Sequence, residues 1–82
     1  KEFIQIKQFI DESKFNYNDI RFLYFFPSGR WDIHTNSGTV IKLPKSKIKE
    51  KLKLAYSLST SGKFKNLTLI DVRQKNQIVI NE

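Results

Sequence analysis

The sequence contains no cysteine, and it has only one histidine, two prolines and three glycines. Without cysteine, no disulfide can hold the fold and no thiolate can serve as a nucleophile or a metal ligand. No apolar run approaches the ~20 residues that a membrane-spanning helix requires, and no signal peptide is recognisable. The chain starts at Lys1 rather than at a methionine. With 82 residues, of which 39% are hydrophobic, we expect residues 1–82 to form a single domain that is a fragment of a longer protein.

The scarcity of histidine and glycine argues against an enzyme. His34 falls on the polar side of a predicted strand beside Asp32, and no serine lies in a sharp strand-to-helix turn near it. A metal site would need further histidines or carboxylates at ligand spacing, and the isolated glycines form no phosphate-binding loop. The sequence therefore predicts no enzymatic activity, no cofactor, no bound metal and no small-molecule substrate.

Negative charge is also scarce, since eight Asp and Glu stand against fifteen Lys and Arg, for a net charge of +7. One segment, Lys42 to Lys65, alone carries a net charge of +7. Such a segment more often solubilises a helix than binds phosphate. A small basic nucleic-acid-binding module that uses this patch is the alternative. Against it, most aromatic residues lie in Phe22 to Trp31, where alternation predicts that they are core, and no RNP-like or helix-turn-helix pattern is present.

Hydrophobic periodicity predicts the order helix, three strands, helix, two strands. The first helix is expected over Glu2 to Ser13, where Phe3, Ile6, Phe9 and Ile10 recur at helical spacing and form one apolar face. The predicted fold class is α+β, with the helices packed on a mostly antiparallel sheet.

The first strand is expected over Asp19 to Phe26, a run of β-branched, aromatic and leucine side chains in which both faces are apolar. This pattern is typical of an interior strand that is covered on both sides. Pro27 and Gly29 then indicate a tight reversal, because Pro fixes φ and Gly accepts a positive φ. We therefore expect an interior strand that leads into a hairpin.

The second strand starts at Trp31. Along this strand, apolar residues such as Trp31 alternate with polar residues such as Asp32, and we expect the polar face to be solvated. Asn36 to Gly38 makes the next turn, into a strand over Thr39 to Leu43. Pro44 has no N–H to donate, so we expect it to stop that strand and to sit in the first turn of a helix. The regular alternation places Trp31 in the core.

The second helix is expected over Lys45 to Ser59. Leu54 and Leu58 lie on a flank among lysines, outside the face that is expected to meet the core. They are either ordinary exposed leucines or the place where another domain or a partner rests. The residues expected to face the core are Ile48, Leu52, Ala55 and Tyr56.

Two short strands are expected at the end of the chain, over Leu67 to Val72 and Gln77 to Asn81. The connection between them, Arg73 to Asn76, is polar and short enough for an antiparallel pair. Ile78 and Ile80 are expected to face inward, because their side chains recur at period two and are apolar.

Several short motifs follow one another in the last part of the chain: Arg30-Trp31, Asn36 to Gly38, Leu43-Pro44, Ile48 to Tyr56, and Ile70-Asp71-Val72-Arg73. Their order and spacing resemble the C-terminal half of the periplasmic β domain of the FtsQ/DivIB family of bacterial cell-division proteins. The resemblance covers about Asp19 to Glu82. Each motif alone is common, so the resemblance depends on their order.

The resemblance implies a non-enzymatic scaffold in the periplasm that recruits membrane-anchored division partners of the FtsB/FtsL type. In the family, a single inner-membrane helix and a POTRA domain precede this region, so the membrane would be reached only through that upstream anchor. A partner strand would pair with the unpaired margin of the last strand, and basic side chains would favour an acidic partner. The residues expected to bind the partner are Arg73, Gln74, Lys75, Asn76, Gln77, Ile78, Val79, Ile80, Asn81, Arg30, Lys47, Lys51 and Leu54.

Overall fold

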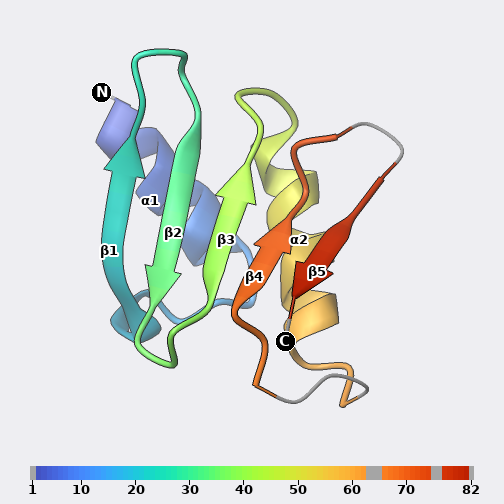
Figure 1. Ribbon diagram of the computed structural model, residues 1–82. Coiled ribbons are helices and arrows are strands. Elements are labelled where there is room, and N and C mark those ends of the chain that lie inside the picture. The colour runs from blue at the N-terminus through green and yellow to red at the C-terminus, as the bar shows by residue number, and fades with distance from the viewer. Residues whose placement is uncertain (1, 63–65, 75–76, 82) are drawn as a thin grey trace.

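The computed structural model describes residues 2–62, 66–74 and 77–81. Helices and a five-stranded sheet make up this part of the chain (Figure 1). The predicted α+β class and order of elements are confirmed, with a short 3-10 turn added before the first strand. The elements are α1 (Glu2–Glu12), η1 (Tyr17–Asp19), β1 (Ile20–Phe25), β2 (Trp31–Thr35), β3 (Val40–Leu43), α2 (Ile48–Ser59), β4 (Leu69–Asp71) and β5 (Val79–Asn81).

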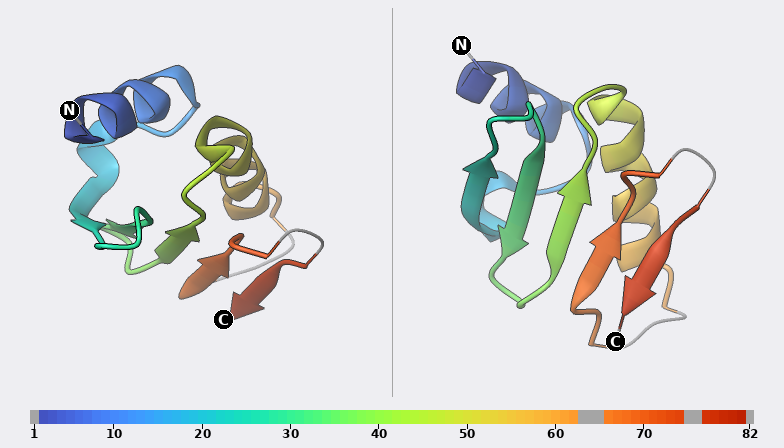
Figure 2. Two further views of the ribbon diagram at one scale, coloured as in Figure 1. Left: turned by 90° about the horizontal axis from the view of Figure 1, so that it is seen from above. Right: turned by 45° about the horizontal axis from the view of Figure 1, so that its top comes forward.

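The strands lie side by side in chain order, so β1 and β5 form the two edges of the sheet. Neighbours run antiparallel except β3 and β4, which are parallel because α2 carries the chain back between them. Both helices lie on the same side of the sheet (Figure 2). We call the other side the open face, because no helix of the described residues covers it.

A row of apolar residues crosses the helix-facing side of the sheet, because the strand register aligns them. Ile33 lies opposite Leu23 of β1 and Ile41 of β3, and the row continues through Ile70 of β4 to Ile80 of β5. The helices close over this row and bury it. Their fully buried side chains are Ile6, Ile10, Leu52 and Ala55, which confirms the predicted core-facing sides at these positions.

The prediction that β1 is an interior strand is wrong. β1 lies at an edge, and Phe22, Tyr24 and Phe25 are 46%, 46% and 47% exposed. The reason is that both helices pack on one side, so Phe22 and Tyr24 on the open face of β1 have no layer to bury them. Phe25 lies on the helix-facing side, where its ring contacts that of Trp31 at 4.9 Å, but it stands at the outer margin of the sheet. The exposed rings contact their neighbours instead: the ring of Tyr24 lies 4.9 Å from that of His34, and Phe22 lies 5.9 Å from Tyr24.

β2 also differs from its predicted pattern. Trp31 is 6% exposed, as expected for a core residue, but Asp32 is only 7% exposed and does not lie on a solvated face. Arg30 covers its carboxylate through an ion pair with an Nη1 to Oδ1 distance of 3.1 Å. A carboxylate can be buried at this low exposure because its charge is paired.

The second helix begins later than predicted. It starts at Ile48, and Pro44 lies in the connection that precedes it rather than in its first turn. Lys47 has a left-handed backbone, with φ 57 and ψ 37. Because a left-handed residue cannot belong to a right-handed helix, the helix can begin only after Lys47.

Candidate partner-binding site

β5 is the last strand of the sheet, and no described strand or helix lies beyond it (Figure 1). β4 and β5 pair antiparallel as predicted, although both are shorter than the expected Leu67 to Val72 and Gln77 to Asn81. An edge strand leaves N–H and C=O groups without partners in its own sheet. The outer margin of β5 can therefore accept the backbone of a neighbouring strand.

The hydrogen bonds between β3 and β4 show which way the backbone groups of β4 point. The N–H of Val40 donates to the carbonyl oxygen of Thr68 at 3.0 Å, and the N–H of Val72 donates to that of Lys42 at 3.1 Å. Thr68 and Val72 flank β4, so Ile70, which lies between them at the same parity, turns its backbone groups toward β3. At the start of β4 the N–H of Thr68 donates instead to the carbonyl oxygen of Asn81 at 2.9 Å. Because successive residues of a strand point in opposite directions, odd-numbered residues of β4 turn theirs toward β5.

This alternation identifies the outward-facing residue of β5. Val79 and Asn81 lie opposite Asp71 and Leu69, so their backbone groups face β4. Ile80 lies between them, and its N–H and C=O point away from the sheet. An added strand would therefore form its first main-chain bonds with Ile80.

The apolar side chains around this edge are more exposed than predicted. Ile78 is 41% exposed, so the prediction that it faces inward is wrong: it precedes β5, where the ladder no longer fixes its direction. Ile80 packs against the core as predicted, and Val79 is 37% exposed. Of the polar residues predicted for this site, Gln74, Gln77 and Asn81 are exposed, while Lys75 and Asn76 lie outside the described residues.

Arg73 follows β4, and Asp71 holds its guanidinium. Nη2 of Arg73 lies 2.7 Å from Oδ2 of Asp71, and Nε lies 2.9 Å from Oδ1. These side-chain hydrogen bonds lower the pKa of Asp71 below its usual value, against the opposing effect of burial, and they raise the pKa of Arg73. The Arg73 side chain remains 35% exposed, so its unused donors can reach a partner's carboxylate.

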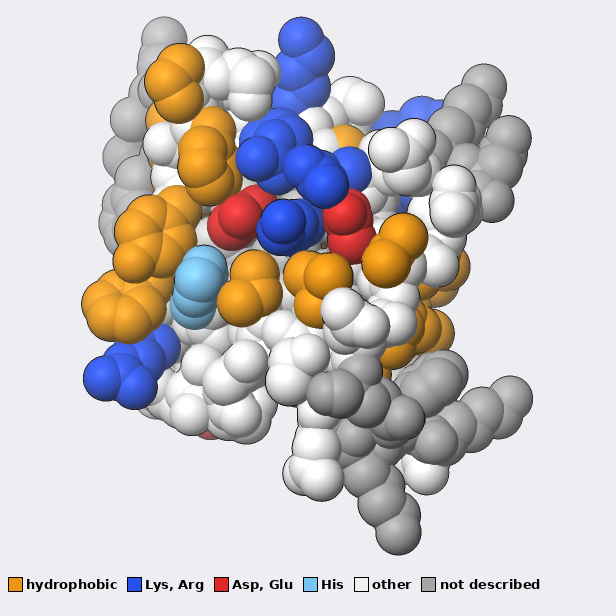
Figure 3. Space-filling model, viewed as in Figure 1, with side chains coloured by type: hydrophobic (Ala, Val, Ile, Leu, Met, Phe, Trp, Pro, Cys, Tyr) orange, Lys and Arg blue, Asp and Glu red, His pale blue; other side chains and the backbone are white. Residues whose placement is uncertain are grey.

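A row of alternating charges crosses the open face of the sheet (Figure 3). Asp32 and Asp71 flank Lys42, because the register places Lys42 opposite both. Arg30 and Arg73 each bind one of these carboxylates, at 3.1 and 2.7 Å. The aspartate side chains are 10% and 11% exposed, whereas the arginine side chains are 25% and 35% exposed. This face therefore presents its cations to solvent and covers its carboxylates.

The site residues predicted near α2 lie in a different part of the molecule. Lys47 is exposed and Lys51 is partly buried. Lys51 lies in α2 and Lys47 directly precedes it, and α2 packs on the side of the sheet opposite the open face (Figure 2). Leu54 packs against the core, so the prediction of an exposed leucine flank is wrong. The structure thus separates the predicted residues into an edge group at β5 and a helix group at α2.

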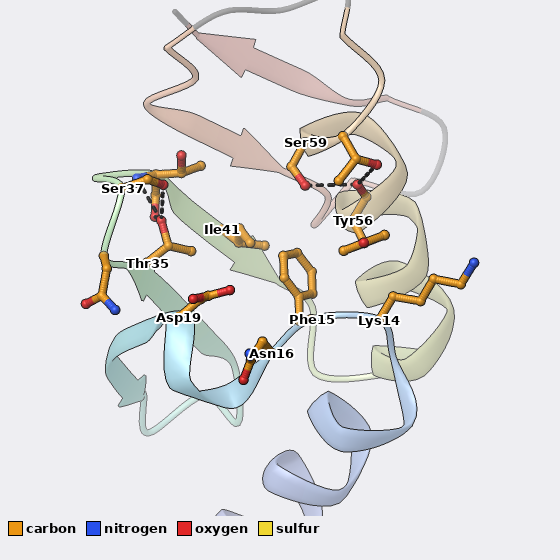
Figure 4. A pocket seen from close by; sticks show the side chains of 12 residues that line it. Lys14, Phe15, Asn16, Asp19, Thr35, Ser37, Ile41, Tyr56 and Ser59 are labelled. Carbon is orange, nitrogen blue, oxygen red and sulfur yellow. Dashed lines mark hydrogen bonds between the residues drawn. The ribbon is translucent and has the colours of Figure 1, made fainter.

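A pocket of about 610 Å³ opens between η1, the turn after β2 and the end of α2 (Figure 4). In it, Phe15 and Tyr56 meet edge to face, with ring centroids 5.2 Å apart. The charged residues of its lining are Lys14 and Asp19. A lone carboxylate and no histidine give it no paired acid and base. Elsewhere in the described residues, no cluster of histidine and carboxylate side chains is arranged to hold a metal ion.

The exposed rings of β1 are the feature that the sequence reasoning missed. A strand with two apolar faces fits either the interior of a covered sheet or an edge with an apolar open face. Arg21, at the start of the strand, was the signal that could have separated these possibilities, because a charged residue is rarely tolerated in an interior strand and is common at an edge.

Neither helix of the described residues is long and apolar enough to cross a membrane. No family model matches the chain, and no curated protein matches its sequence.

Proposed function

We propose that this chain is a non-enzymatic docking module of the bacterial division machinery, similar to the β domain of FtsQ/DivIB. It acts in the periplasm and recruits membrane-anchored partners of the FtsB/FtsL type by accepting a partner strand along β5. The observation that carries this proposal is the outer margin of β5, which no described strand or helix covers and toward which the alternation of the ladder directs the N–H and C=O of Ile80.

The residues around Ile80 supply affinity and specificity for such a strand. Ile78 and Val79 are exposed apolar side chains, and covering each one contributes about 0.5–1 kcal/mol, a fraction of the value for a fully buried side chain. Arg73 adds an exposed guanidinium next to the strand. An extended segment with alternating apolar and acidic residues fits these groups, and its negative charge raises the association rate at low salt.

Backbone N-methylation of Ile80 tests the proposal, because it removes the outward donor and leaves the side chain unchanged. The variant is made by chemical synthesis and ligation, and its fold is checked by circular dichroism. Binding of a peptide from the extracytoplasmic end of an FtsB-type partner, measured by titration calorimetry, is expected to weaken by about tenfold or more.

The matched control is N-methylation of Phe25 on the opposite edge. The N–H of Phe26 donates inward to the carbonyl oxygen of Arg30, so the N–H of Phe25 points outward, like that of Ile80. This control is expected to bind the peptide as the unmodified chain does. Unchanged binding after methylation of Ile80, or an equal loss in both variants, contradicts docking at β5.

Nucleic-acid binding remains the alternative, since the exposure of Phe22 and Tyr24 removes the objection that the aromatic residues are core. The lysines of α2 lie in the helix layer, so most of the predicted Lys42 to Lys65 patch does not share a surface with these rings. The cations on the same face as the rings are Arg30, Arg73 and Lys42. Titration with a single-stranded oligonucleotide at several salt concentrations separates the two functions. Tight binding that weakens steeply with salt would favour the alternative.

A further inference from the structure

β1 is the longest strand of the sheet and forms the edge opposite β5. The N–H of Phe26 donates to the carbonyl oxygen of Arg30 at 2.9 Å. Even-numbered residues from Phe22 onward therefore turn their backbone groups toward β2, and the N–H and C=O of Leu23 and Phe25 point away from the sheet. This edge offers more outward backbone groups than β5, where they come from Ile80.

The middle of β1 lacks the features that keep edge strands from pairing. Arg21 and the register shift beside it protect only the beginning of the strand. Residues 22–26 contain no charge and no proline, and Phe22, Tyr24 and Phe25 are nearly half exposed. Hydrophobic side chains form a column along this margin of the open face (Figure 3). An unpaired apolar edge of this kind is an association surface.

We propose that β1 pairs antiparallel with β1 of a second copy of this chain, across a two-fold axis beside Tyr24. In this register Leu23 of one protomer lies opposite Phe25 of its partner, and the two exchange main-chain hydrogen bonds through the groups that point outward. On the open face, Tyr24 lies opposite the partner's Tyr24. Phe22 lies opposite the partner's Phe26.

The partner that fits the β1 edge best is a second copy of this chain, because the edge is complementary to itself. A two-fold interface requires one surface to fit itself, and this register sets every side chain from Phe22 to Phe26 against an apolar one. Each aromatic pair across the strands contributes about 0.2–1 kcal/mol. Arg21 meets the end of the partner's strand at Pro27. The guanidinium of Arg21 lies over the ring of Phe22, and that of Arg30 over the ring of Phe26, at 5.5 and 4.6 Å from the ring centroids. The pairing of Phe22 with the partner's Phe26 therefore brings cations near each other at the two ends of the interface, where added salt screens their repulsion. A nucleic acid or an acidic segment would find cations at the two ends of this run, where Arg21 and Arg30 lie over the rings of Phe22 and Phe26, but no charge on residues 22–26 themselves.

The expected dimer is weak and strengthened by salt. Pairing of two short strands buries less than about 1,200 Å², which is the range of transient complexes. Each chain carries a net charge of +7, so the protomers repel each other at low salt, and added salt screens this repulsion. The β5 edges remain free at the two ends of the joined sheet, so self-association does not compete with docking there.

Sedimentation equilibrium at rising protein concentration, in low and high salt, measures the dimer. Tyr24→Lys places two like charges opposite each other at the two-fold axis and is expected to raise the dimer Kd by at least about tenfold. Tyr24 is 46% exposed, so the variant is expected to fold, and circular dichroism checks this. Val79→Lys is the matched control, because it adds the same charge at an exposed position on β5, and it is expected to dimerise normally.

Backbone methylation supplies a second, independent test. N-methylation of Phe25 removes an outward donor and is expected to abolish the dimer, whereas N-methylation of Ile80 leaves it intact. A chain that stays monomeric at all concentrations, or a dimer that survives both Tyr24→Lys and methylation of Phe25, overturns the proposal. So does a polyuridylate probe that binds with steep salt dependence and is released by Tyr24→Ala, because the rings would then be a stacking platform.

Discussion

The guanidinium of Arg73 donates hydrogen bonds to both carboxylate oxygens of Asp71, with Nε to Oδ1 and Nη2 to Oδ2 distances of 2.9 and 2.7 Å. The backbone N–H of Arg73 adds a third hydrogen bond, to Oδ1, at 3.1 Å. Asp71 lies at the end of β4, opposite Val79 of β5. The pair therefore fixes the chain where it leaves β4, at the point that sets the position of the β5 edge.

Replacement of Asp71 by Asn is expected to destabilise the protein by about 1–3 kcal/mol at neutral pH, because it leaves the guanidinium of Arg73 without its counter-charge. The folded state holds the pKa of Asp71 below its usual value of 3.8. The contribution of the pair is thus fully present above that value and is lost as the pH falls through the lower pKa of the folded state. Urea unfolding at pH 7 and in acid measures both effects.

The matched control is Asp11→Asn on α1. Asp11 pairs with Lys7 at 3.0 Å, but both side chains are about half exposed, and such pairs contribute about 0–1 kcal/mol. A loss for Asp71→Asn no greater than for Asp11→Asn, or one that persists unchanged into strong acid, would count against the stabilising role of the Asp71 pair.

The sequence predicted well those elements in which the spacing of the apolar residues alone identifies the buried face. Ile6 and Ile10 recur at helical spacing and are fully buried in α1, and Trp31 and Ile33 recur at period two and are buried in β2. The prediction that β1 is an interior strand was wrong because two apolar faces on a strand do not determine how many layers cover the sheet. That number depends on both helices packing on one side, which is a property of the whole fold.

The sequence predicted an edge at β5, and the structure places β5 at one, but the sequence could not identify which residue of β5 turns its backbone groups outward. The outward direction of the Ile80 backbone follows from the parallel pairing of β3 with β4, which the sequence of β5 does not encode. The burial of Asp32 under Arg30 was missed for a similar reason. Alternation assigns a residue to a face of the sheet, but the neighbouring side chains determine whether that residue is exposed to solvent.

Thr39→Val is expected to destabilise the protein by about 1–3 kcal/mol. The hydroxyl of Thr39 is buried and donates to the carbonyl oxygen of Leu67 at 2.7 Å, which joins the start of β3 to the segment before β4. Valine has the same shape but leaves that oxygen without its donor. Thr60→Val removes an exposed hydroxyl that donates to Tyr56 and is expected to change stability by less than about 0.5 kcal/mol. Equal urea midpoints for the two variants would refute this assignment.

Ile33→Ala and Tyr24→Ala are expected to differ sharply, although they lie on adjacent strands. Ile33 is 1% exposed in the middle of the core, and its truncation is expected to cost about 2–5 kcal/mol. Tyr24 is 46% exposed on the open face, so its truncation is expected to cost less than about 1 kcal/mol. Thermal unfolding of dilute protein, where association is negligible, measures both. A large loss for Tyr24→Ala would mean that the open face is buried after all.

Lys47→Gly is expected to leave stability unchanged or to raise it by up to about 1 kcal/mol. Lys47 has a left-handed backbone, with φ 57, which costs a residue with a side chain about 1 kcal/mol and costs glycine nothing. Its carbonyl oxygen accepts the N–H of Lys51 at 3.0 Å, and glycine keeps this bond. Lys53→Gly removes the same charge from an exposed position inside α2 and is expected to cost about 1 kcal/mol, because glycine is a poor helix former. The urea midpoint of Lys47→Gly should therefore lie above that of Lys53→Gly. A loss of stability for Lys47→Gly as large as that for Lys53→Gly would show that the left-handed backbone before α2 carries no strain.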